Sequence, residues 1–182
     1  GGTDPGKVGV DGSLEKDINL AVAERLKTYL EQDDVKVIMT RETDTGLYSE
    51  TDSRKKMADM KKRCEIIEES GADLVVSIHQ NSYSAEYVHG AQVFYYSTSS
   101  GGKALAECIQ EHLISEADPS NTRAAKGNSE YLVLRESPCT AVIVECGFLS
   151  NNEDVKNLSD KEYQSKVAFT IFCGFLDYWR KA

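Results

Sequence analysis

The stretch DLVVSIHQNS, residues 73–82, decides the fold, because a run of aliphatic residues ends in a histidine and then in polar residues. Leu74, Val75 and Val76 follow one another, so apolar side chains lie on both faces of the expected strand, which indicates burial on both faces. His79 then lies where a buried strand reaches the surface, and open α/β sheets hold their ligands at such strand ends. The segment alone leaves an alternative open, in which His79 only hydrogen-bonds loop backbone.

Other apolar runs extend this pattern along the chain. Four of them have the composition of strands: VKVIMT (35–40), TAVIVE (140–145), AQVFYY (91–96) and YLVLR (131–135). Helical spacing of apolar residues separates these runs, over residues 15–31, 53–70, the segment that follows Gly101-Gly102, and 161–180. Helices that alternate with buried strands imply a parallel sheet. The sequence therefore predicts one α/β domain over residues 1–182, with a mostly parallel twisted sheet and helices on both faces.

Finer expectations concern the helices. Ser13 is the expected N-cap of the first helix. The last helix is expected to bury Trp179 with its other apolar residues, and His112 on the third helix is interpreted as a helix-surface or core-edge residue rather than a ligand. The second helix is expected to bury one apolar stripe, made of Met57, Met60, Cys64 and Ile67.

Composition excludes several classes of protein. Of the 182 residues 40% are hydrophobic and 28% are charged, as in ordinary globular proteins, and no apolar run approaches the ~20 residues that a membrane-spanning helix needs. The net charge of −9 argues against nucleic acid as a partner, because binding phosphates relies on clustered Lys and Arg. Five cysteines without CxxC spacing disfavour a structural zinc knot or a dithiol centre, and we interpret them as buried small hydrophobes.

Three polar side chains stand where this architecture brings sites together. Glu145 ends the run AVIVE as His79 ends its own, and parallel strands open on the same edge of the sheet. Glu15 follows the glycine-rich segment GGTDPGKVGVDGS, in the first turn of a helix. Taken alone, Glu15 is explained by the helix dipole, which is worth ~0.3–1 kcal/mol for a carboxylate at that position.

The same residues discriminate between kinds of chemistry. The glycines at 6, 9 and 12 do not form GxGxxG, and no Gly-Lys-Ser/Thr follows, so a nucleotide site is rejected. Ser/His/Asp catalysis is disfavoured because no GxSxG elbow is present. One histidine, one or two carboxylates and a loop of small residues suit a catalytic zinc ion, which takes nitrogen and oxygen ligands and keeps one position open for water.

In order and spacing, the pieces GGTDPG, LEKDINLAVAERL, ADLVVSIHQNS, GAQVFYY and VIVECGFLSNNED resemble the zinc-dependent N-acetylmuramoyl-L-alanine amidases of the amidase_3 family. The resemblance covers nearly the whole chain, and VECGFLSN together with SIHQNS is its most specific part. The further pieces AECIQEHL, DPSNTR and EYQSKVA resemble the sporulation and germination branch of that family, the CwlD-like amidases.

The resemblance implies a role for each matching residue. Glu15 corresponds to the carboxylate ligand of the zinc ion, His79 to a histidine ligand, and Glu145 to the catalytic glutamate. The family has a further histidine ligand directly before the Gly-Gly of this motif, whereas the present chain starts at Gly1, so we expect that ligand and the opening strand to be missing here. Asn81 either orients substrate or caps the turn after the strand.

The resemblance also implies a reaction and its setting. The expected reaction is zinc-dependent (Zn2+) hydrolysis of the amide bond between the lactyl group of N-acetylmuramic acid and L-alanine in peptidoglycan, outside the cytoplasm, in the cell wall or spore cortex. An accessory protein is a possible partner. The competing hypothesis is a catalytically impaired module of the same fold that docks peptidoglycan or a partner protein. Two residues are given no role: His89 is expected in a solvent-facing loop, and Cys146 in the core.

Overall fold

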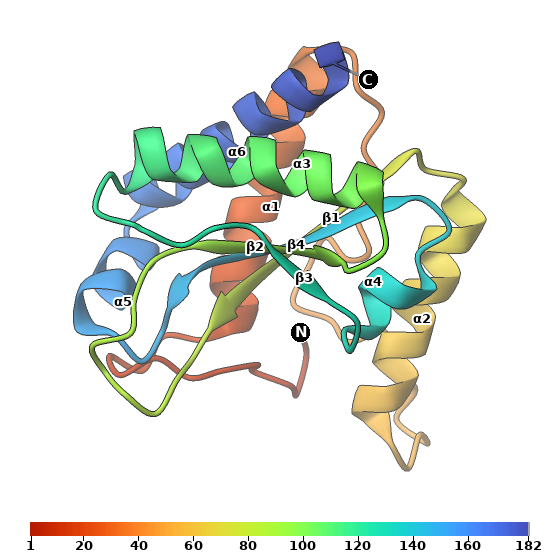
Figure 1. Cartoon of the computed structure of the whole chain (residues 1–182). Helices are drawn as coiled ribbons and strands as arrows, with labels where there is room; N and C mark the ends of the chain where they lie inside the picture. The colour runs from red at the N-terminus through yellow and green to blue at the C-terminus, as the bar shows by residue number, and fades with distance from the viewer. Residues whose placement is uncertain (182) are drawn as a thin grey trace.

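The computed structural model describes residues 1–181 and centres on one four-stranded sheet with the order β1-β4-β2-β3. Figure 1 shows this sheet crossing the middle of the molecule, with helices above and below it. The strands are β1 (Leu74–Asn81), β2 (Gln92–Tyr96), β3 (Lys126–Asn128) and β4 (Thr140–Phe148).

The pairing of the strands makes the sheet mostly parallel. β1 runs parallel to β4 and β2 runs parallel to β3, while β2 and β4 are antiparallel. β4 lies between β1 and β2 and is buried from Ala141 onward, which accounts for its continuous apolar sequence. The predicted α/β class and mostly parallel sheet are therefore confirmed.

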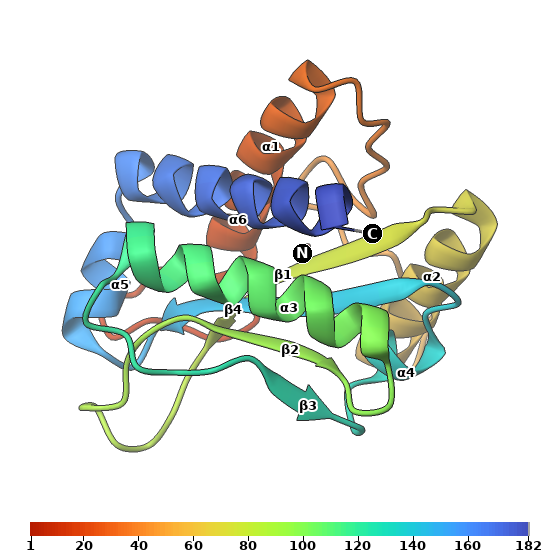
Figure 2. The same ribbon diagram turned by 45° about the horizontal axis from the view of Figure 1, so that its top comes forward.

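Helices cover both faces of the sheet, as the sequence predicted. Figures 1 and 2 show α1, α3 and α6 together on one face, with α5 beside them, and α4 with α2 toward the other face. The helices are α1 (Glu15–Gln32), α2 (Lys55–Ser70), α3 (Ser100–His112), α4 (Leu132–Glu136), α5 (Asn152–Leu158) and α6 (Lys161–Lys181), and a π-helical turn, η1 (Leu113–Ala117), continues α3.

Each face of the sheet has its own apolar cluster. Alternate residues of β4 point to opposite faces, so Val142 and Val144 join the larger cluster, whereas Ala141 and Ile143 join the smaller one. The larger cluster takes its helical side chains from α1, α3, α5 and α6, and the smaller one includes Leu134 of α4. Cys146 is 2% exposed and belongs to the larger cluster, as expected.

Two of the predicted strands are wrong. Residues 35–40 form no strand ladder within residues 1–181, and Lys36 and Ile38 are exposed rather than buried. A strand needs a neighbour for its backbone groups, and among the described residues none lies along this segment. YLVLR is also no strand: after Asn128 Oδ1 accepts the backbone N–H groups of Glu130 and Tyr131, the chain turns into helix α4.

Three finer predictions about the helices are also wrong. Leu14, not Ser13, is the N-cap of α1, and the buried Ser13 hydroxyl has no hydrogen-bond partner among residues 1–181. Met57 is 52% exposed, so the predicted stripe of α2 is only partly buried, with Ile67 as its buried member. Trp179 is 56% exposed and stacks on Phe175, whereas its neighbour Tyr178 packs against the core, so Trp179 lies on the outer side of α6.

Among residues 1–181, no helix combines the length and the apolar character that crossing a lipid bilayer requires.

Candidate active site

The parallel pairing of β1 and β4 brings His79 and Glu145 together. The two residues face each other in the register of the ladder, and both strands run slightly past them, to Asn81 and Phe148. The register shifts just after His79, so the ladder is irregular where the two strands end. The sequence predicted that these two strand ends share one edge of the sheet, and the observed register confirms that placement.

Glu15 reaches the same place from the first turn of α1. Its Oε1 lies 3.0 Å from His79 Nδ1, and its Oε2 accepts the backbone N–H of Lys7 at 2.8 Å. Burial by itself would raise the pKa of Glu15, but the hydrogen bonds from His79 and from the Lys7 backbone outweigh it and lower that pKa to about 2. Glu15 is therefore ionised, and the proton between the two residues belongs to His79 Nδ1.

The glycine-rich segment before α1 explains how a loop can pack on Glu15. Gly6 has a φ of 70°, in the left-handed region that favours glycine. A Cβ atom at Gly6 would come within 2.5 Å of Glu15 Oε2. Only glycine lets the backbone pass this closely, and the next residue, Lys7, then donates its N–H to the carboxylate.

The other ring nitrogen of His79 is held as well. His79 Nε2 lies 3.1 Å from Ser77 Oγ, and a hydroxyl can either donate to this nitrogen or accept from it. Ser77 therefore holds the Nε2 side of the ring while Glu15 holds the Nδ1 side. Together Glu15 and His79 present a carboxylate oxygen and an imidazole nitrogen side by side, which are donor types that zinc takes in proteins.

Glu145 is in a different state from Glu15. It is 8% exposed, and its Oε2 has no hydrogen-bond partner among residues 1–181. Burial raises the pKa of Glu145 to about 7; nearby His79 partly offsets this effect, and the Glu15 carboxylate adds to it. Two neighbouring carboxylates thus have pKa values pushed far apart, the pattern found where an acid or base must work near neutral pH.

Asn81 makes contacts that belong to the turn. Its Oδ1 accepts the backbone N–H of Ser82 at 2.8 Å, and its backbone carbonyl accepts the N–H of Leu149 at 2.8 Å. These contacts support the turn-capping alternative, and they leave the side-chain NH₂ group without a role in the turn. Beyond β4, Asp154 Oδ2 accepts the N–H groups of Phe148 and Gly90 at 2.8 and 2.9 Å, which fixes the end of that strand.

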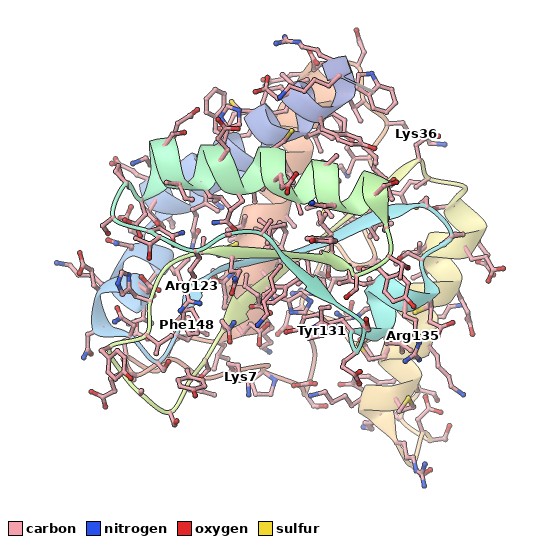
Figure 3. The ribbon with its side chains drawn as sticks, in the orientation of Figure 1. Lys7, Lys36, Arg123, Tyr131, Arg135 and Phe148 are labelled. Atoms are coloured by element: carbon pink, nitrogen blue, oxygen red, sulfur yellow. The ribbon has the colours of Figure 1, made fainter. Side chains whose placement is uncertain are left out.

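Several neighbours of the site were not found from the sequence. Burial, and secondarily Glu145, raise the pKa of Tyr131, which places this phenol near the glutamate. Arg123 lies over the ring of Phe148 at 4.7 Å, beside the end of β4. Figure 3 labels Tyr131, Arg123 and Phe148. Lys7, on the amino-terminal loop, is labelled below them. Phe148 lies in VECGFLSN and Arg123 in DPSNTR, two pieces that the sequence analysis quoted, but it assigned neither residue a role.

The remaining histidines lie elsewhere. His89 is exposed in the loop before β2, as predicted. His112 is partly exposed at the end of α3, at the edge of the core, but it also belongs to a group of side chains that could hold a metal ion. The ligand atoms of His112, Glu116 and Cys173 lie within 4.8 Å of one another.

Comparison with known proteins places this geometry in a family. The sequence profile of Amidase_3, described as N-acetylmuramoyl-L-alanine amidase, matches residues 1–176. A germination-specific N-acetylmuramoyl-L-alanine amidase of Bacillus subtilis is 38% identical, over 97% of this chain and 78% of its own length.

Solved structures agree with the sequence match. The CwlD amidase of Clostridioides difficile, determined in complex with the GerS lipoprotein, is 39% identical with a TM-score of 0.97, covering 100% of this chain and 95% of that one. The amidase AmiC2 of Nostoc punctiforme is 33% identical with a TM-score of 0.86, covering 99% of this chain and 92% of that one. On sequence and on structure alike, this chain belongs to the Amidase_3 family of N-acetylmuramoyl-L-alanine amidases.

Proposed function

We propose that this chain hydrolyses, in a zinc-dependent reaction, the amide bond between the lactyl group of N-acetylmuramic acid and L-alanine in peptidoglycan. The observation that carries the proposal is the pairing of two unlike carboxylates at one edge of the sheet. Glu15 is ionised against His79, whereas Glu145, with a pKa of about 7, has a buried oxygen that lacks a partner among residues 1–181. This arrangement provides a metal-binding pair and a separate base.

The donor set fits a zinc ion. Glu15 Oε1 and His79 Nδ1 are 3.0 Å apart, so both can turn to one ion, and the Lys7 N–H and Ser77 Oγ hold the other ends of the two side chains. Glu15 and His79 would hold the ion, with water or a further ligand completing its coordination. When bound, zinc polarises the amide carbonyl and lowers the pKa of a coordinated water.

Glu145 supplies the proton transfers in this proposal. Its carboxylate accepts the proton of the attacking water, and because its pKa is about 7 it is partly ionised at neutral pH and can give the proton back. The amine of L-alanine then leaves with that proton. Glu145 Oε2 makes no hydrogen bond within residues 1–181, so no donor competes with the water for this oxygen. The cycle returns Glu145 to its starting state and requires no covalent intermediate.

The first experiment replaces the base. Glu145→Gln keeps the shape of the side chain but cannot accept a proton, so we expect amide release from muramyl peptide fragments to fall by at least ~10²–10⁴-fold. The matched control is Glu130→Gln, which changes an exposed glutamate. Substantial activity in Glu145→Gln, measured with zinc added, would remove Glu145 from the catalytic role.

The second experiment separates the enzyme from a binding module. Amide release is measured after treatment with a chelator, and again after zinc is restored, alongside sedimentation of the chain with intact peptidoglycan. The zinc-dependent amidase requires that hydrolysis disappears with the chelator and returns with zinc. Sedimentation without hydrolysis under every metal condition would instead support the impaired docking module.

The setting of the reaction follows from the relatives. The germination-specific relative from Bacillus subtilis and the CwlD amidase in complex with the GerS lipoprotein support a role in the cell wall or spore cortex, outside the cytoplasm. They also support an accessory protein as partner. Hydrolysis of spore cortex fragments is the test: a chain that cleaves vegetative peptidoglycan but leaves cortex intact, alone and with a lipoprotein partner, contradicts this setting.

A further inference from the structure

A second group of metal-ligating side chains lies where α3, η1 and α6 pack together. His112 Nδ1 is 2.7 Å from Glu116 Oε1, and His112 Nε2 is 2.9 Å from Asp177 Oδ2. Cys173 completes the group, with its Sγ, a His112 nitrogen and a Glu116 oxygen all within 4.8 Å of one another. None of these residues takes part in the site formed by Glu15, His79 and Glu145.

The backbone builds this group from two pairs with the same spacing. His112 and Glu116 are four residues apart, as are Cys173 and Asp177, so each pair lies on one helical face. Glu116 stands in η1, a π-helical turn, and such turns are frequent at functional sites. The two pairs therefore face each other across the packing of α3 with α6, which Figure 2 shows side by side.

The close approach of the two helices is fixed beside the group. Gly174, the neighbour of Cys173, is buried, and a Cβ there would come within 2.5 Å of the backbone of Ile109. The helices consequently contact each other through backbone at this point. Cys173 is half-buried and His112 has 21% of its side chain exposed, so the group is held by packing but still open to solvent.

The donor types discriminate between classes of metal ion. A thiolate, an imidazole and a carboxylate together favour zinc over magnesium or calcium, which prefer oxygen ligands only. Because His112 Nδ1 faces Glu116, an ion on that nitrogen leaves the Nε2–H to donate to Asp177. A carboxylate in that position orients a ligating histidine and raises its basicity.

We propose that His112, Glu116 and Cys173 form a second zinc site, separate from the proposed catalytic pair, with Asp177 as the residue that positions His112. The site would hold α3 to α6 and leave a coordination position for water. The competing explanation is a protonated His112 that bridges the two carboxylates without any metal.

Cadmium distinguishes these explanations, because a thiolate bound to cadmium absorbs in the ultraviolet by charge transfer, and the catalytic pair contains no thiol. The full chain is titrated with Cd2+ in the Glu15→Gln background, which removes a ligand of the other site. We expect a charge-transfer band that saturates at one equivalent and is displaced by Zn2+. The band should be absent in Cys173→Ser and retained in Cys108→Ser, whose thiol is also half-buried but outside the group.

A second variant tests the positioning role. Asp177→Asn should retain the band but weaken the affinity for Cd2+ by ~10–100-fold. It should also lower the thermal stabilisation that Zn2+ gives to the parent chain. The proposal is overturned if no band forms, if the band persists in Cys173→Ser, or if Cys108→Ser loses it equally. A His112 that only bridges carboxylates predicts the first of these results, with stability independent of Zn2+.

Discussion

Replacing Glu145 by glutamine should change how the stability of the fold depends on pH. The pKa of Glu145 is raised, chiefly by burial, from the ordinary value of 4.5 to about 7. In the folded chain Glu145 therefore keeps a proton at pH values where the unfolded chain has lost it. Unfolding releases that proton, so the free energy of unfolding falls as pH rises from about 4.5 to about 7.

The size of this effect follows from the shift. About 2.5 pKa units at ~1.36 kcal/mol each give a loss of ~3 kcal/mol between those pH values. Glu145 is 8% exposed, so solvent screening removes little of it. Glu145→Gln cannot ionise and should not show this loss. The stability of the variant relative to the parent should therefore increase by ~3 kcal/mol between pH 4.5 and pH 8, whatever their difference at low pH.

Urea unfolding followed by circular dichroism at several pH values measures this difference. A chelator is present throughout, so that bound metal does not alter the ionisation of Glu145. Glu130→Gln is the matched control and should show the same pH dependence as the parent, because Glu130 is exposed. Parallel pH curves for the parent and Glu145→Gln would refute the reasoning that burial holds this carboxyl protonated.

Three further predictions concern the supports of the fold and the site. Glu15→Gln should weaken zinc binding by at least ~10–100-fold, measured by competition with a chromogenic chelator, because an amide carries no charge for the ion; unchanged affinity would exclude Glu15 as a ligand. Gly174→Ala should lower the free energy of unfolding, measured in urea, by ~1–3 kcal/mol, because the added Cβ would come within 2.5 Å of the Ile109 backbone. A gain in stability would show that α3 and α6 can separate without cost. Asp154→Ala should cost ~1–3 kcal/mol, since it leaves two backbone N–H groups without the acceptor they use at 2.8 and 2.9 Å, and faster hydrogen exchange at Phe148 and Gly90 should accompany it.

The sequence predicted elements well where an apolar run was long or strongly periodic. β4 is buried on both faces, and α1 and α6 have apolar residues at helical spacing over many turns, so pattern and structure agree for these elements. β1 also forms where the sequence predicted it, but its predicted burial on both faces is wrong, because β1 is an edge strand in which only Ile78 and Gln80 are buried. The segment 35–40 is rich in β-branched and aliphatic residues, as the start of β1 is, but a strand depends on a neighbour that local sequence does not reveal. YLVLR is too short for its period to separate strand from helix, and the turn made by Asn128 decides it.

The candidate site shows the same division between residue type and environment. The sequence suggested which strand ends meet, because parallel strands open on one edge, and the ladder places His79 opposite Glu145. Apart from the family resemblance, the sequence did not show that Glu15 and Glu145 differ in ionisation, since both are glutamates. The difference comes from two contacts of Glu15, with the backbone N–H of Lys7 and with the His79 ring, whereas Glu145 Oε2 has no hydrogen-bond partner among residues 1–181.

Those two contacts explain why one carboxylate can serve as a ligand and the other as a base. Glu15 accepts hydrogen bonds from His79 and from the backbone of the loop that Gly6 allows to approach. These hydrogen bonds keep the Glu15 carboxylate ionised far below neutral pH. Glu145 lies opposite the same histidine but has no donor for its Oε2 within residues 1–181, so burial dominates and its pKa rises to about 7. The unequal hydrogen bonding of two glutamates around one histidine, set by a glycine in a loop, therefore separates the two roles in the proposed reaction.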